Sequence, residues 1–212
     1  FGAFVDIKWI DSEKITEENV KETLEGVSGV IVPGGFGNRG IEGMIITANY
    51  CRTNNLPYLG ICLGMQIAVI SFARYVCNIP DANSREFSEN GLHNVIDFLP
   101  DQTDKTDKGG TLRLGAYPCS VKEDTMMYKC YKAKDISERH RHRYEFNNEY
   151  RELLEKAGLT ISGTSPDDYI VETVEIKEND FYVGVQFHPE FKSRPNKPHP
   201  LFLGLIEAAL NK

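Results

Sequence analysis

The segment Gly60-Ile61-Cys62-Leu63-Gly64 has the spacing of a nucleophile elbow with cysteine in the place of the usual serine. It lies between a short apolar run and a stretch whose apolar residues recur at helical spacing. In such an elbow the nucleophile sits on a strained turn, and only small residues two positions away avoid a clash. The dipole and N–H groups of the following helix should favour the thiolate, the reactive form of cysteine. Cys62 is therefore the candidate nucleophile, and the other four cysteines are interpreted as packing residues.

A cysteine nucleophile needs a base, and the base needs a group that orients it. His188 follows an apolar strand-like run at 181–187 and is followed by Pro189 and Glu190. Residues two apart in an extended chain point to the same side. We therefore expect His188 to act as the base and Glu190 to fix its tautomer. The alternative is a strand-end histidine beside a solvated glutamate, which the cysteine elbow makes the weaker reading.

Acyl transfer also needs hydrogen-bond donors for the developing negative charge on oxygen. The elbow supplies the backbone N–H of Leu63. The loop Pro33-Gly34-Gly35-Phe36-Gly37, which follows an apolar run at 27–32, can supply a second donor from Gly35. A plain turn is the alternative for this loop.

The elements that must position these residues alternate between strand-like and helix-like segments. Strands are predicted at 5–10, 27–32, 57–61, 112–121, 159–163, 169–176 and 181–187, and helices at 16–25, 41–54, 65–76, near 147–157 and at 201–210. This alternation predicts an α/β fold: a doubly wound, mostly parallel sheet with helices on both faces, in a single domain over 1–212. The polar, glycine-ended segment 101–110 is predicted to be a mobile surface loop.

Composition excludes several classes of protein. The chain has 212 residues, which suits one domain, and a net charge of −7, which disfavours nucleic acid and acidic membranes as partners. Its apolar runs are too short to cross a bilayer, and no basic-then-apolar leader opens it. Five cysteines without a CxxC pair indicate free thiols in a reducing compartment, so we expect a cytoplasmic protein. The chain begins at Phe1 and not Met, which we interpret as a piece of a longer protein.

Three motifs, PGGFG, GICLGMQ and QFHPEF, occur in this order and resemble those of the class I glutamine amidotransferases. Longer segments resemble the glutaminase domains of the CTP synthase family: DANS, GGTLRLG, ERHRHRYE and the tail FHPEFKSRPNKPHPLF. This resemblance covers essentially the whole chain.

The resemblance implies that Cys62 attacks the side-chain amide of glutamine to form a thioester, that His188 moves the protons, and that Glu190 orients His188. It implies an oxyanion hole and a glutamine pocket whose residues are Gly35, Leu63, Gly64, Met65, Gln66, Glu86 and Arg143. A zwitterion needs a carboxylate for its ammonium and an arginine for its carboxylate, which suits Glu86 and Arg143. Arg139 and Arg141 have a weaker claim, and no metal ligands are expected.

For the full-length family the resemblance implies a synthetase domain on the same polypeptide that uses ATP and Mg²⁺, and a homo-oligomer, expected to be a tetramer. It also implies GTP as an allosteric activator close to Phe36 and the segment 101–113, whereas glutamine hydrolysis itself needs no cofactor. Two departures are visible: the opening strand and helix of these domains are missing, and no GxxxxGK[ST] phosphate loop occurs. This chain alone is therefore not expected to make CTP.

Three other interpretations of the function remain open. The chain could be the glutaminase unit of another ammonia-using synthetase, a γ-glutamyl hydrolase or cysteine peptidase, or a non-catalytic regulatory module. Gln66, Glu86 and Arg143 favour a free amino acid over a peptide as substrate. An intact Cys–His–Glu set argues against a non-catalytic module.

Overall fold

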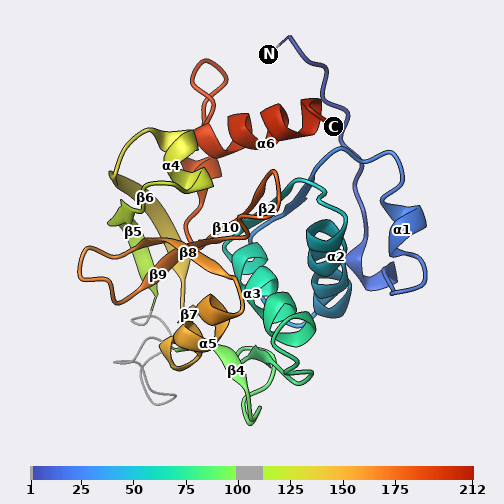
Figure 1. The fold of residues 1–212 in the computed structure, drawn as a ribbon, viewed down its shortest axis with the longest axis vertical. Coiled ribbons are helices and arrows are strands. Elements are labelled where there is room, and N and C mark those ends of the chain that lie inside the picture. Colours follow the sequence, from blue (N-terminus) through green and yellow to red (C-terminus); the bar gives the residue numbers. More distant parts are fainter. Residues whose placement is uncertain (1, 99–111) are drawn as a thin grey trace.

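A computed structural model describes residues 2–98 and 112–212, which form one seven-stranded sheet and a smaller three-stranded one (Figure 1). The large sheet runs in the order β1 (Val30–Val32), β2 (Tyr58–Ile61), β10 (Tyr182–Val185), β9 (Val171–Glu175), β8 (Thr160–Thr164), β5 (Arg113–Val121) and β6 (Asp135–His142). The small sheet holds β3 (Asn83–Ser84), β4 (Asn94–Phe98) and β7 (Tyr144–Phe146).

The large sheet is less parallel than predicted. The pairs β1–β2 and β2–β10 are parallel. The pairs β10–β9, β9–β8, β8–β5 and β5–β6 are antiparallel. The reason is connection length: β8 to β9 and β9 to β10 are joined by short loops, and short loops can join only antiparallel neighbours. The α/β class is confirmed, but the parallel part is confined to the three strands nearest the cysteine elbow.

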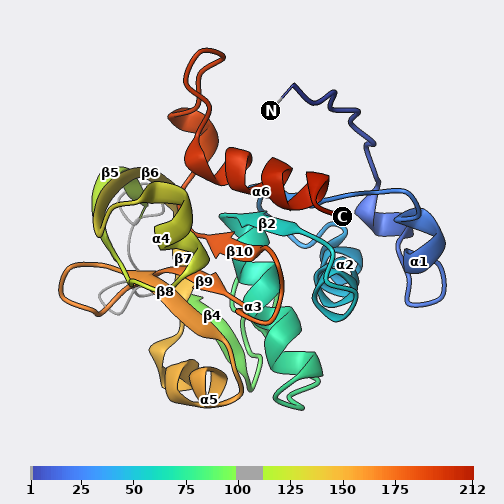
Figure 2. The same cartoon turned by 45° about the horizontal axis from the view of Figure 1, so that its top comes forward.

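Helices lie on both faces of the sheet, as predicted (Figures 1 and 2). On one face lie α2 (Ile41–Thr53) and α3 (Leu63–Tyr75), and on the other lie α4 (Met126–Tyr131) and α6 (Pro200–Leu210). Shorter elements complete the set: α1 (Val20–Thr23), α5 (Arg151–Lys156), and the 3-10 turns η1 (Ser12–Lys14), η2 (Asn148–Tyr150) and η3 (Pro189–Phe191). Within the described residues, no helix has the length and apolarity to span a membrane.

One hydrophobic cluster packs on each face of the large sheet. Successive residues of a strand point to opposite faces, so they belong to different clusters. On β2, Tyr58 belongs to the cluster under α2 and α3, while the next residue, Leu59, belongs to the cluster under α6. On β10, Tyr182 and Val183 divide in the same way. Both central strands are completely buried, which explains why their sequences are continuously apolar.

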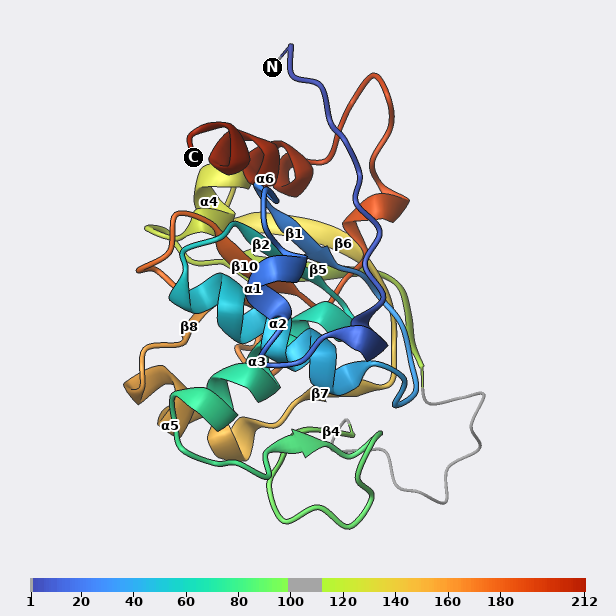
Figure 3. The ribbon, with the colours of Figure 1, turned by 90° about the vertical axis from the view of Figure 1, so that its right-hand side faces the viewer.

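The amino-terminal prediction was wrong. Residues 5–10 form no strand, and most of their apolar side chains are exposed: Val5 by 57%, Ile7 by 65% and Trp9 by 89%. Figure 3 shows this segment as an extended chain along the outside of the molecule. An extended sequence becomes a strand only where a neighbouring strand accepts its hydrogen bonds. The predicted helix at 16–25 is reduced to α1, and the predicted loop at 101–110 lies outside the described residues.

Four strands were not predicted: β3, β4, β6 and β7. The sequence of β6, DISERHRH, is dominated by charged residues, and its apolar period is weak. Its burial nevertheless alternates, with Glu138, His140 and His142 facing inward. Because the buried side chains of this strand are polar, hydrophobic periodicity did not predict it.

Candidate active site

Cys62 occupies the tight turn between β2 and α3, with φ 51° and ψ −100°. Positive φ is unfavourable for any residue other than glycine, so surrounding contacts must hold this backbone in place. The Cys62 N–H donates to the carbonyl of Val185 on β10 at 2.7 Å. The Cys62 carbonyl accepts from the N–H groups of Met65 at 3.1 Å and Gln66 at 3.3 Å in the first turn of α3. The predicted nucleophile elbow is present.

The glycines on either side of Cys62 are required by close backbone contacts. A Cβ at Gly60 would lie 2.4 Å from the carbonyl oxygen of Gly64, and a Cβ at Gly64 would lie 2.1 Å from the carbonyl oxygen of Val32 on β1. No side chain fits at such distances. The turn therefore packs against the end of the neighbouring strand only with glycine at both positions.

His188 and Glu190 form a pair at the end of β10. The Nδ1 of His188 donates to Oε1 of Glu190 at 2.6 Å, because a carboxylate oxygen can only accept. The backbone N–H of His188 donates to the carbonyl of Arg139 at 2.8 Å, and its ring stacks on Phe191 with centroids 4.8 Å apart. Among the described residues nothing hydrogen-bonds the buried Nε2 of His188. That nitrogen is left with its lone pair available for a proton.

The loop after β1 brings the thiol and the imidazole to the same place. A Cβ at Gly34 would lie 2.8 Å from Cε1 of His188 and 3.6 Å from Cβ of Cys62. The next residue, Gly35, is packed against Leu63, since a Cβ there would lie 3.1 Å from Cδ2 of that leucine. The segments that carry the two predicted oxyanion donors, Gly35 and Leu63, are therefore neighbours beside Cys62.

The start of the helix favours ionisation of Cys62, as expected, but burial of the thiol outweighs it. Burial raises the pKa of the Cys62 thiol to about 12, and the hydrogen bond from the Leu63 N–H opposes this rise without overcoming it. The carboxylates of Glu145 and Glu190 raise the pKa of the thiol further. Loss of hydration outweighs the helix terminus here, so the thiol keeps its proton until a base removes it.

For Glu190, burial would raise the pKa of the carboxyl, but the hydrogen bond from His188 and the other favourable contacts outweigh burial, and the pKa is lowered. Glu190 therefore stays ionised and holds the His188 Nδ1–H tautomer. The pair therefore leaves Nε2 as the ring nitrogen of His188 without a hydrogen bond among the described residues.

The residues predicted to hold glutamine lie around this turn. Oε1 of Glu86 accepts from the N–H of Gly37 at 2.8 Å. Burial raises the pKa of Glu86, and the positive charge of Arg143 is near enough to act against that rise. Gln66, in the first turn of α3, donates through Nε2 to the carbonyl of Tyr144 at 3.1 Å, next to Arg143 in the chain. Glu86 is thus bound to the loop after β1, Arg143 lies near Glu86, and Gln66 bonds to the residue that follows Arg143.

Other predicted residues have less direct places. The side chain of Met65 is fully buried and lies against Gly184, where a Cβ would be 3.1 Å from it, so only its backbone can face the site. Phe36 is 89% exposed on the loop that carries Gly35. Arg139 and Arg141 lie on the exposed side of β6. Neither arginine faces the thiol from that side of the strand.

Comparisons with known proteins identify the family of this chain. The family model described as glutamine amidotransferase class-I matches residues 1–208. The chain belongs to the class I glutamine amidotransferases. This amidotransferase is 58% identical over 211 residues to a CTP synthase of Staphylococcus saprophyticus, and 56% identical over 207 residues to one of Caldanaerobacter subterraneus. These matches cover 100% and 98% of the chain, but 39% and 38% of the relatives. The chain therefore spans about two fifths of the relatives' length.

A solved structure of the Trypanosoma brucei CTPS glutaminase domain with bound acivicin is also similar. Its TM-score is 0.94 at 41% identity, with 99% of this chain and 82% of that chain covered. The likeness confirms the predicted class I glutamine amidotransferase fold.

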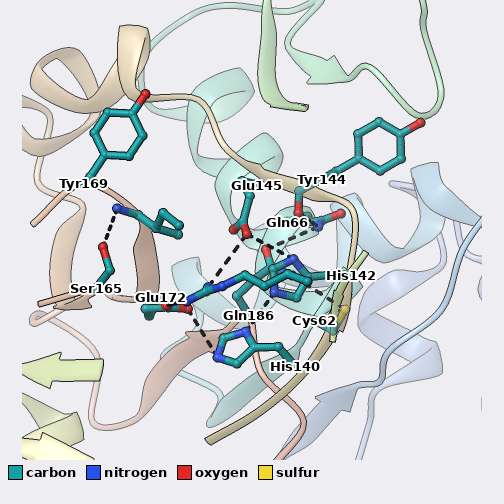
Figure 4. A network of polar contacts seen from close by, with 12 residues as sticks. Cys62, Gln66, His140, His142, Tyr144, Glu145, Ser165, Tyr169, Glu172 and Gln186 are labelled. Atoms are coloured by element: carbon teal, nitrogen blue, oxygen red, sulfur yellow. Dashed lines mark hydrogen bonds and ion pairs between the residues drawn. The ribbon is translucent and has the colours of Figure 1, made fainter. Parts of the chain in front are cut away.

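Behind the thiol of this amidotransferase lies a buried polar network that the sequence did not predict (Figure 4). Arg113 on β5 pairs with Glu172 on β9 at 2.6 Å and lies 3.8 Å from Glu145 on β7. Nδ1 of His140 lies 2.8 Å from Nε2 of His142, and these two rings approach Glu172 and Glu145. Charged groups in a protein interior persist only when they are paired, so this set is tightly constrained.

Burial and neighbouring charges determine which residues of this network are charged. Burial is the main cause that lowers the pKa of His140 to about 2 and of His142 to about 3, and the cation of Arg113 contributes to both shifts. Both histidines are therefore neutral. Burial also raises the pKa of Glu145 and of Glu172. Within the described residues, no group of three or more His, Cys, Asp or Glu side chains is arranged to hold a metal ion.

Gln186 is another residue of the site that the sequence analysis did not predict. Its Nε2 donates to Sγ of Cys62 at 3.6 Å, and its Oε1 accepts from Nε2 of Gln66 at 3.3 Å (Figure 4). A signal was present, because Gln186 stands two residues before His188, as Glu190 stands two residues after it. The argument that paired His188 with Glu190 extends one step back to Gln186.

The lowered pKa of Glu190 predicts a pH-dependent contribution to stability. Its folded pKa lies below the ordinary value of 4.5, so its stabilisation is present above that value and is lost as pH falls through the folded pKa. We expect the parent to have a higher Tm than Glu190→Gln at pH 7, and the difference to shrink below about pH 4.5. The measurement is Tm against pH, with the exposed Glu25→Gln as control. A Tm difference that grew on acidification would contradict this assignment.

Proposed function

We propose that this domain hydrolyses L-glutamine to glutamate and ammonia through Cys62, His188 and Glu190. The observation that carries the proposal is that Cys62, on its strained turn, and His188, whose Nδ1 is bound to Glu190, both lie against Gly34. Membership of the class I glutamine amidotransferases supports glutamine as the substrate.

In the first half-reaction, Nε2 of His188 takes the proton of the thiol as the sulfur attacks the side-chain carbonyl carbon of glutamine. The raised pKa of Cys62 makes this transfer necessary, because the resting group is a neutral thiol. Negative charge then develops on the former carbonyl oxygen. The N–H groups of Leu63 and Gly35 are the proposed donors for this oxyanion.

Collapse of the tetrahedral intermediate breaks the C–N bond. His188 returns its proton to the nitrogen, which leaves as ammonia, and the glutamyl group stays on Cys62 as a thioester. In the second half-reaction His188 removes a proton from water, which attacks the thioester carbonyl. The C–S bond then breaks, glutamate is released, and His188 returns the proton to the sulfur of Cys62. Glu190 keeps the same tautomer of His188 through both halves.

The charges around the thiol suit the other end of glutamine. Arg143 is proposed to bind the α-carboxylate, and Glu86 the α-ammonium. Gln66 uses its amide nitrogen for Tyr144 and Gln186, so its Oε1 is the end that can accept from the ammonium. Backbone atoms of Gly64 and Met65 complete the proposed pocket.

We further propose that the ammonia serves a synthetase domain on the same polypeptide, which would aminate UTP to CTP with ATP and Mg²⁺. The support is the similarity to CTP synthases that are much longer than this chain. In that setting GTP is the proposed activator, near the exposed Phe36, and the full-length protein is proposed to be a cytoplasmic homo-oligomer, expected to be a tetramer. The segment 101–110 belongs to this proposal by sequence alone.

Cys62→Ala should abolish glutamine hydrolysis, because no neighbouring group can replace the thiolate as nucleophile. Ammonia release from free glutamine measures this, and a parallel assay with a γ-glutamyl peptide separates an amidotransferase from a γ-glutamyl hydrolase. Cys119→Ala is the matched control: Cys119 is equally buried, on β5, and should affect packing alone. Equal activity of Cys62→Ala and the parent would refute the mechanism.

Arg143→Ala should raise KM for glutamine more than it lowers kcat. Its proposed partner, the α-carboxylate, is remote from the bond that breaks, and a charge-assisted contact contributes about 1.5–3 kcal/mol, or roughly ten- to hundred-fold in KM. Steady-state kinetics test this, with the exposed Arg139→Ala as control. If KM rises in the control and not in Arg143→Ala, the carboxylate is bound elsewhere.

A further inference from the structure

Gln186 contacts the sulfur of Cys62 from the strand end that also carries His188. Its side chain is fully buried, and its backbone N–H is held by the carbonyl of Glu172 at 2.8 Å. We propose that the side-chain amide of Gln186 is part of the catalytic machinery: it holds the Cys62 sulfur as a hydrogen-bond acceptor during attack, and Gln66 fixes the amide in that orientation. The proposal rests on the proposed function only in taking Cys62 as the nucleophile.

The orientation of the amide follows from a chain of hydrogen bonds with one direction. The carbonyl of Tyr144 can only accept, so the group that faces it must be the NH₂ end of Gln66. The same Nε2 lies 3.3 Å from Oε1 of Gln186, which must therefore be the acceptor end of that amide. The NH₂ end of Gln186 is then left facing Sγ of Cys62, at 3.6 Å. A flipped Gln186 would set two NH₂ groups against each other.

A donor aimed at the sulfur discriminates between its two protonation states. An N–H stabilises a thiolate more strongly than a neutral thiol, because hydrogen bonds to charged acceptors are the stronger ones. A buried amide that made no useful contact would cost stability, since its polar groups have lost their hydration. Methionine would fill the same volume without that cost, so packing alone does not account for glutamine here.

The thiol needs such a donor because the charged groups near it oppose its ionisation. Glu145 on β7 and Glu190 in η3 both raise the pKa of Cys62, in addition to burial. Acting the other way are the N–H of Leu63 at the start of α3 and the amide of Gln186. His188 completes the set that faces the thiol, as the base that takes its proton. The amide of Gln186 is uncharged, so it stabilises the thiolate without adding a charge that would have to be neutralised after attack.

Alkylation of Cys62 tests the proposal without glutamine. The rate of reaction of the whole chain with iodoacetamide is followed from pH 6 to 11, and mass spectrometry assigns the adduct to Cys62. In Gln186→Met we expect the rate at pH 8 to fall about ten- to hundred-fold, the range for losing a hydrogen bond to a charged group. The rise of the rate with pH should move up by about one to two pH units.

A second variant guards against a folding defect. Gln186→Glu keeps the shape, and its carboxylate can accept from Gln66 but cannot donate to sulfur. It should therefore slow alkylation more than Gln186→Met above the pKa of the new carboxyl. Thr173→Val, which removes a buried hydrogen bond to Ser162 on neighbouring strands, is the control and should leave the profile unchanged.

The outcomes are distinct. A lowered Tm with an unchanged alkylation profile in both Gln186 variants would show a purely structural role and overturn the proposal. Slowed alkylation in both, with the control unchanged, would support it. If glutamine proved not to be the substrate, the alkylation result would still stand, so failure of the proposed function and failure of this inference are separable.

Discussion

The structure of the site depends on the backbone of one residue, Cys62, held at positive φ between a parallel strand and a helix. A conformation of this kind costs on the order of 1–3 kcal/mol, which the surroundings must offset. The offset comes from both sides: the carbonyl of Val185 holds the turn to β10, and the first turn of α3 bonds back to the carbonyl of Cys62. Gly60 and Gly64 permit the approach of β2, α3 and β1 that these bonds require. The parallel core of the sheet is thus the part of the fold that the thiol needs.

Burial is the second physical theme of the site. The turn that exposes a serine in other elbows here carries a thiol that is 5% exposed, and the loss of water raises its pKa. A pre-formed thiolate would be more reactive toward oxidants as well as toward substrate. In the proposed mechanism, a neutral thiol that loses its proton only to His188 restricts reaction to the moment when a substrate is in place. In the same proposal, the contact of His188 with Glu190 and the amide of Gln186 make the ionised state accessible.

The sequence predicted the residues that carry local signatures. Cys62 was found from glycine spacing and His188 with Glu190 from a strand end, and the helices α2, α3 and α6 were found from apolar periodicity. It did not predict Arg113, Glu145 and Glu172, because these lie on β5, β7 and β9 and meet only when non-adjacent segments fold together. The segment 5–10 failed for a related reason: its pattern suits a strand, but strand formation depends on a partner that local sequence does not specify. The sequence located the helix terminus that lowers the pKa of Cys62, but it did not show the burial that raises this pKa by more.

The polar network behind the site links the strands that surround it. Arg113 and Glu172 tie β5 to β9, His142 and Glu145 join β6 to β7, and the backbone of Glu172 holds Gln186. Replacing Arg113 or Glu172 alone would leave its buried partner unpaired, which is strongly destabilising. This constraint makes the position of Gln186, and through it the environment of the sulfur, a property of the whole antiparallel half of the sheet.

The most direct test of the account is to trap the covalent intermediate. The chain is mixed with glutamine, quenched in acid within one turnover, digested at low pH and analysed by mass spectrometry. The account predicts a γ-glutamyl thioester on the peptide that contains Cys62, which hydroxylamine removes, and its absence in Cys62→Ala. Glutamine hydrolysis with a γ-glutamyl adduct on a different cysteine would contradict the account.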